Sequence, residues 1–141
     1  MKNINRKGFT IVELVIVIAV IAILAAVLIP TFSGVTTRAQ ESARLQETRN
    51  AMMNYLAQQE NGIIANNTEF YYFENGLPTA AGTNYKAYKF TYNNGALTKT
   101  TDAVTVVVEV SGETKTYKID SAEVTFTATD NTKVYIKTVT P

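Results

Sequence analysis

The chain has 141 residues, with 13 Lys and Arg, 12 Asp and Glu, and neither His nor Cys. The lack of Cys excludes disulfides, and the lack of both His and Cys removes most transition-metal sites and the common nucleophile–base pairs of hydrolases. The sequence also contains no phosphate-binding loop, no nucleophile-elbow motif and no cluster of carboxylates, so it argues against an enzyme and predicts neither a cofactor nor a metal.

The first predicted element is a helix in an apolar run of 21 residues from Phe9 to Ile29, in which only Thr10 and Glu13 are polar. A helix of this length reaches about 32 Å, which matches the hydrocarbon thickness of a bilayer, about 30 Å. A helix that is apolar on every side is either buried or in lipid, and the rest of the chain is too short to enclose it. We therefore predict a transmembrane helix over residues 9–30.

The residues before this run carry three positive charges, from Lys2, Arg6 and Lys7, and no negative charge. Such a charge distribution holds the N-terminus in the cytoplasm and places the remainder of the chain outside. The order of segments is not that of a secretory signal peptide, because the apolar run is too long and no small-residue cleavage site follows it. Cleavage is instead predicted before the run, after Gly8, which would remove residues 1–8.

The basic leader, Gly8, the segment FTIVEL, the long apolar run and Pro30 together resemble the N-terminal signature of type IV prepilins. The resemblance covers residues 6–30. In this family of type IV pilins and pseudopilins, a prepilin peptidase cuts after the glycine and methylates the new N-terminal residue, here Phe9. The resemblance places Glu13 fifth in the mature chain and implies a subunit that polymerises through its N-terminal helix.

Glu13 is an acidic residue inside a predicted membrane span. A lone carboxylate in hydrocarbon is either protonated or paired with a cation. The new ammonium group of Phe9 on an adjacent subunit would supply such a partner if the two helices were staggered by about one turn. Glu13 would then set the register of assembly; in the alternative interpretation it lies near the lipid headgroups and has no such role.

Pro30 lies at the outer end of the predicted span. Proline lacks an N–H and its ring clashes with the carbonyl four residues earlier, so it kinks or ends a helix. We expect a kink in a continuing helix, because residues 31–62 again have helical periodicity and end at Asn61-Gly62. The apolar stripe that indicates this second, amphipathic helix consists of Val35, Ala39, Ala43, Leu45, Met52, Met53 and Leu56.

Charged residues alternate in sign along the second helix. Arg38–Glu41 and Arg44–Glu47 are spaced as stabilising i, i+3 pairs. A solvated face explains the pattern better than subunit contacts or a nucleic-acid site, because acidic residues interrupt the basic ones.

Residues 63–141 are predicted to form one globular domain together with residues 31–62. Residues 63–83 read as a loop around the aromatic run Phe70-Tyr71-Tyr72-Phe73, which either wedges the loop onto the helix and sheet or forms an adhesive surface. From Tyr85 onward strands dominate, and Asn93-Asn94-Gly95 predicts a hairpin. The expected fold is α+β, with an antiparallel sheet of four to five strands packed on the helix.

These features predict a structural subunit of a type IV pilus-like filament, held before assembly in the bacterial cytoplasmic membrane and afterwards at the cell surface. The resemblance implies that its partners are copies of itself, minor pilins, prepilin peptidase and the inner-membrane assembly machinery, with lipid around the helix before assembly. Two alternatives stay open. One is a pseudopilin of a type II secretion or DNA-uptake machine; the other is an unprocessed single-pass anchor that presents a binding domain.

Overall fold

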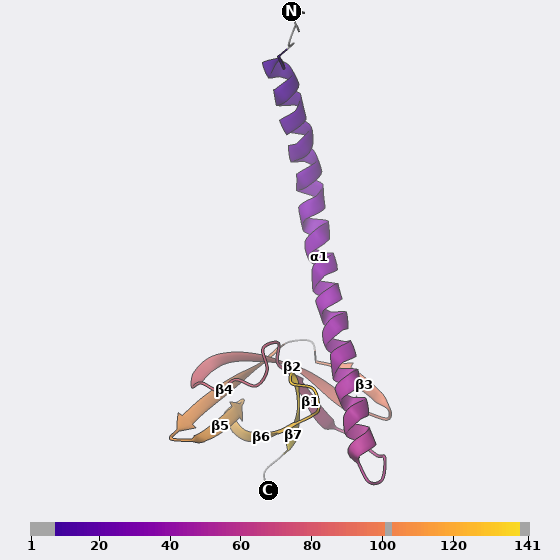
Figure 1. The fold of residues 1–141 in the computed structure, drawn as a ribbon, viewed down its shortest axis with the longest axis vertical. Helices are drawn as coiled ribbons and strands as arrows, with labels where there is room; N and C mark the ends of the chain where they lie inside the picture. The colour runs from indigo at the N-terminus through magenta and orange to yellow at the C-terminus, as the bar shows by residue number, and fades with distance from the viewer. Residues whose placement is uncertain (1–7, 101–102, 139–141) are drawn as a thin grey trace, which may run out of the picture. The chain divides into compact units, whose positions relative to one another are not determined.

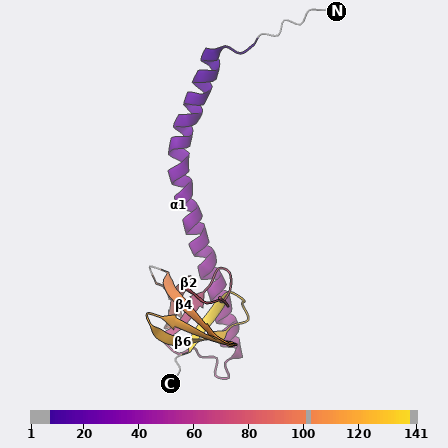
Figure 2. The same ribbon diagram turned by 90° about the vertical axis from the view of Figure 1, so that its left-hand side faces the viewer.

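A computed structural model describes residues 8–100 and 103–138 (Figures 1 and 2). These residues form a long helix, α1 (Ile11–Gln58), followed by seven β-strands. The chain divides into two compact units within α1, the first ending at Glu41 and the second beginning at Ser42. The charges predicted to form the leader, on Lys2, Arg6 and Lys7, lie outside the described residues.

The strands of the second unit form one antiparallel sheet of order β1-β7-β6-β5-β4-β2-β3, and a further pairing of β1 with β2 closes six of them into a barrel. The predicted α+β class and antiparallel pairing are confirmed, but the predicted number of strands is wrong. The strands are β1 (Thr68–Tyr72), β2 (Gly82–Asn93), β3 (Ala96–Lys99), β4 (Val104–Ser111), β5 (Thr114–Ile119), β6 (Ala122–Ala128) and β7 (Val134–Thr138).

The two strands that the sequence prediction missed are β1 and β3. β1 contains most of the aromatic run that was assigned to a loop, and it pairs with β2 on one side and with β7 on the other, with Phe70 opposite Ile136. It lacks polar alternation because both of its faces are buried. β3 has only four residues, which is too short for a periodic signal.

The predicted hairpin is present. β2 turns at Asn94-Gly95, where both residues have positive φ values of 49° and 85°, as a two-residue type I′ turn requires. The returning chain pairs with β2 first as β3 and then as β4, with Phe90 opposite Lys99 and Ala87 opposite Val104.

The aromatic run of β1 contributes to two separate hydrophobic cores. Phe70 and Tyr72 face the last turns of α1, whereas Tyr71 and Phe73 face the barrel interior, and all four are at most 4% exposed. The side chains therefore pack α1 onto the sheet and fill the barrel, so the adhesive interpretation of the run is wrong. The helix-side core consists of Ala51, Ile64, Phe70, Tyr72, Phe90, Val134 and Ile136, and the barrel core of Tyr71, Phe73, Ala87, Val106, Ile119 and Val124.

Polar contacts fasten the part of α1 after Glu41 to the barrel. Arg44 forms an ion pair with Glu74 beyond the end of β1, and its guanidinium carbon lies over the Tyr88 ring. Glu47 lies 3.9 Å from the ammonium of Lys133. The expected Arg44–Glu47 pair is therefore replaced by contacts to the barrel, because this face of the helix is covered instead of solvated.

A half-buried ion cluster joins the three strands at the barrel closure. The carboxylate of Glu69 on β1 pairs with Lys89 on β2 and, at 3.1 Å, with Lys137 on β7, and it accepts a 2.8 Å hydrogen bond from the Tyr71 hydroxyl. Burial alone would raise the pKa of Glu69, but the bonds from Lys89, Tyr71 and Lys137 outweigh burial and lower this pKa below its ordinary value. Burial and the bond to Glu69 raise the pKa of the Tyr71 hydroxyl.

Candidate assembly helix

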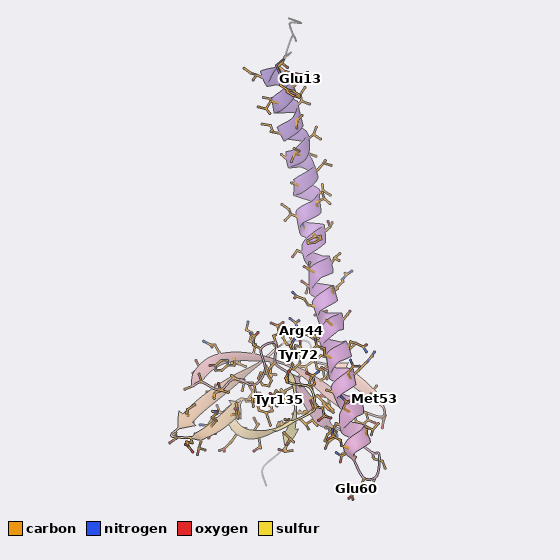
Figure 3. All side chains as sticks on the ribbon, in the orientation of Figure 1. Glu13, Arg44, Met53, Glu60, Tyr72 and Tyr135 are labelled. Atoms are coloured by element: carbon orange, nitrogen blue, oxygen red, sulfur yellow. The ribbon has the colours of Figure 1, made fainter. Side chains whose placement is uncertain are left out.

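The first unit presents an unusually apolar surface. Every large apolar side chain from Phe9 to Val35 is at least half exposed, from 50% for Val20 to 93% for Phe9. Figure 3 shows these side chains projecting from all sides of α1. α1 is long and apolar enough to cross a membrane, as judged by length and composition. A surface of this kind requires lipid or other apolar helices around it.

Glu13 lies in the first turn of α1 (Figure 3), where it takes part in a reciprocal cap with Thr10. Its Oε2 accepts hydrogen bonds from the Thr10 backbone N–H and the Thr10 hydroxyl, both at 2.8 Å, and the Glu13 N–H donates to Thr10 Oγ1 at 3.2 Å. This is a capping box, in which the first residues of a helix satisfy each other's free donors. The capping box was not predicted, although the spacing T-x-x-E immediately before an apolar run is its usual sequence signal.

The predicted cleavage site precedes the helix. Gly8 and Phe9 are both exposed, and a Cβ atom added to Gly8 would meet no atom within 4 Å. The described residues therefore impose no steric requirement for glycine at position 8.

Pro30 lies inside α1, which continues past it as expected; a helix end at this position is the alternative that the structure contradicts. The Thr31 hydroxyl donates to the carbonyls of Leu28 at 2.9 Å and Val27 at 3.3 Å. Such back-bonding satisfies carbonyls close to the place where proline removes a helical donor. The kink itself stays a prediction.

The described part of the chain holds no group of three or more Asp or Glu residues placed to bind a metal ion. What distinguishes the molecule is thus an exposed apolar helix with a capped start, attached to a folded β domain. Such a helix is typical of membrane-anchored proteins and of proteins that assemble through their helices.

The comparisons with known proteins concern this helix. The profile of the prokaryotic N-terminal methylation motif matches residues 3–29. The chain is similar to the type IV wide pilus major component PilA4 of Thermus thermophilus, with 60% identity over 38 residues, covering 27% of this chain and 29% of that protein. Type IV major pilin protein PilE1 of Neisseria gonorrhoeae is 55% identical over 40 residues, covering 28% and 24%.

A third relative is the type IV major fimbrial protein FimA of Dichelobacter nodosus, with 49% identity over 43 residues, covering 30% of this chain and 28% of that protein. The chain thus spans less than a third of the length of these curated relatives. No solved structure matches it. The resemblance found in the sequence is confirmed for the N-terminal segment, which matches the prokaryotic N-terminal methylation motif and is similar to the same segment of type IV pilins.

Proposed function

We propose that this protein is a structural subunit of a type IV pilus-like surface filament, in which the N-terminal helices pack together and the β domains form the outer coat. The observation that carries the proposal is the exposed apolar helix with a prepilin-type motif, joined to a folded domain. Lipid tails and the side chains of neighbouring helices are similarly apolar surroundings for such a helix. The same surface can therefore serve first as a membrane anchor and then as an interface between subunits.

In this proposal residues 1–8 are a cytoplasmic leader, residues 9–30 the membrane and assembly helix, and residues 31–62 a spine for the domain that extends to residue 141. The positive charges of Lys2, Arg6 and Lys7 hold the leader inside before prepilin peptidase cuts after Gly8 and methylates Phe9. The chain then leaves the membrane through the inner-membrane assembly machinery, and minor pilins can join the same filament.

Glu13 sets the register of assembly in this proposal. Its carboxylate has capacity for further hydrogen bonds beyond the two from Thr10, since a carboxylate offers about four acceptor positions. The mature ammonium of Phe9 on a neighbouring helix is a matching donor. Pro30 lies where the helix leaves the membrane, and a kink there would let the spine change direction.

The mass of the mature N-terminus tests this function. Purified surface fractions are analysed by mass spectrometry, and antibody against the β domain labels cells for electron microscopy. A chain that starts at methylated Phe9 in long labelled filaments is expected. A chain that retains Met1 would favour an unprocessed anchor, and a processed chain without long filaments would favour a pseudopilin.

A further inference from the structure

The chain contains Asn-Gly at three places, Asn61-Gly62, Asn75-Gly76 and Asn94-Gly95. This dipeptide is chemically labile, because glycine has no side chain to hinder attack of its backbone nitrogen on the preceding side-chain amide. All three asparagines are exposed, so access to solvent does not distinguish them.

The hydrogen bonds of the attacking nitrogens do distinguish the three sites. The Gly62 N–H donates to the Gln59 carbonyl at 3.0 Å, and the Gly76 N–H donates to the Phe73 carbonyl at 3.2 Å. The Gly95 N–H has no partner among residues 8–100 and 103–138. Attack at the first two sites therefore requires a hydrogen bond to break first, whereas attack by Gly95 does not.

The side-chain amide of Asn94 is oriented by Asn66. The Asn94 backbone N–H donates to Asn66 Oδ1 at 2.9 Å, which fixes the orientation of the Asn66 amide, and Asn66 Nδ2 donates to Asn94 Oδ1 at 3.1 Å. Nδ2 of Asn94, the group that would leave, has no hydrogen-bond partner within the described part of the chain.

We propose that Asn94 is a site of spontaneous deamidation in the folded protein. The Gly95 nitrogen gives its proton to solvent and forms a bond to Cγ of Asn94, and Nδ2 leaves as ammonia to give a five-membered succinimide. Water then opens the ring at either carbonyl and yields aspartate or isoaspartate. One water is consumed and one ammonia released, and no oxidant or enzyme takes part.

The isoaspartate product changes the β2–β3 turn. It adds one carbon to the backbone of a two-residue loop whose register is set by its length, with Asn93 opposite Ala96. It also disturbs the two hydrogen bonds between Asn66 and Asn94, which join the segment before β1 to the hairpin. A third bond lies beside them, from the Asn67 N–H to the Tyr92 carbonyl at 2.8 Å. Deamidation therefore adds a negative charge and loosens one corner of the domain.

The test follows the three sites in one molecule. The full chain in detergent is incubated at mildly alkaline pH, either folded or in concentrated urea, and peptide mass mapping gives the deamidated fraction at each asparagine over time. In the folded chain, Asn94 is expected to deamidate about fivefold faster than Asn61 and Asn75. This is the ratio of rates that follows if one hydrogen bond of about 1 kcal/mol must break before attack at the two slower sites. In urea the three rates should converge.

Two results would overturn the proposal: a folded chain in which Asn61 or Asn75 reacts as fast as Asn94, or an Asn94 that reacts in urea and is protected by folding. Asn94→Ser serves as the matched control. It should lose the isoaspartate signal from the hairpin peptide and leave the rates at the other two sites unchanged. These rates are measured on the isolated chain, so they are independent of whether it forms filaments.

Discussion

The guanidinium carbon of Arg44 lies 3.8 Å from the centre of the Tyr88 ring, while the same side chain forms an ion pair with Glu74. Arg44 belongs to α1 and Tyr88 to β2, so one side chain joins the spine to the barrel through a cation–π contact and an ion pair. The Arg44 side chain is only 11% exposed, which strengthens both interactions relative to the surface.

Replacing this side chain should therefore destabilise the domain. We expect Arg44→Ala to lower the free energy of unfolding by about 1–3 kcal/mol, from the lost cation–π contact, ion pair and packing. Urea unfolding of the full chain in detergent, followed by circular dichroism, measures it. Arg38→Ala, on an exposed part of the helix, is the control and should change stability little. Equal effects of the two changes would refute the role of Arg44.

The Glu69 cluster should make stability depend on pH. Because the folded-state pKa of Glu69 is depressed below 4.5, its contribution is fully present above about pH 4.5 and is lost as the pH falls through the lower, folded-state value. Glu69→Gln removes this contribution and leaves Lys89 and Lys137 without their carboxylate. The variant should thus be less stable at neutral pH, and the difference from the unaltered chain should shrink in acid.

Thermal unfolding from neutral to acidic pH provides the measurement for Glu69. Glu113→Gln, at the exposed β4–β5 turn, is a control of the same chemistry that lies outside the cluster. A difference between Glu69→Gln and the unaltered chain that stays constant across the acidic range would show that Glu69 does not titrate as proposed.

The Phe126 side chain packs against three other aromatic rings inside the barrel. Its ring centre lies 5.3 Å from that of Tyr71, 5.5 Å from that of Phe73 and 5.6 Å from that of Tyr117, each in an edge-to-face arrangement. Phe126→Leu keeps an apolar side chain but loses these ring contacts, and we expect a loss of about 1–3 kcal/mol in unfolding free energy. Thr127→Ala, a substitution at the neighbouring exposed residue, should change the unfolding free energy little. A comparable loss of unfolding free energy in that variant would contradict the role of the Phe126 ring contacts.

The capping box and the register role of Glu13 can be separated by substitution. Thr10→Val removes the hydroxyl of the cap, at a cost of about 1 kcal/mol to the start of the helix, but leaves the Glu13 carboxylate in place. It should still allow membrane insertion and filament formation. Glu13→Ala should insert normally but enter filaments poorly.

The matching experiment quantifies membrane-bound and filament-bound chain for both variants by immunoblotting of cell fractions. Normal filament yield from Glu13→Ala would reject the register role. A yield that falls equally for Thr10→Val would instead assign the effect to helix capping.

The sequence predicted those elements whose signals are local. The apolar run and the helical periodicity that follows it predicted α1, and the strand-like segments from Tyr85 onward predicted four to five of the seven strands. It did not predict β1 or the closure of the barrel, because β1 pairs with β7, its partner at the far end of the domain sequence, and both faces of β1 are apolar. A pairing of this kind depends on three-dimensional packing and has no periodic signal in the chain.

The same distinction holds for the candidate site. The prepilin-type motif is short and local, so sequence alone identified it. The cap between Thr10 and Glu13 was also readable from spacing and was overlooked. By contrast, the contacts of Arg44 depend on Glu74 and Tyr88, which folding brings to the helix from other elements, and local i, i+3 spacing suggested the wrong partner.

The closed barrel has a consequence for the proposed filament, in which many copies of the domain would lie close together. β1, β2, β4, β5, β6 and β7 each have hydrogen-bonded neighbours on both sides, and β3, which pairs with β2, has only four residues. Few backbone donors and acceptors are thus available for strand addition between domains, the usual route to amyloid-like aggregation. Copies held together at high local concentration can therefore remain separate folded units while their helices associate.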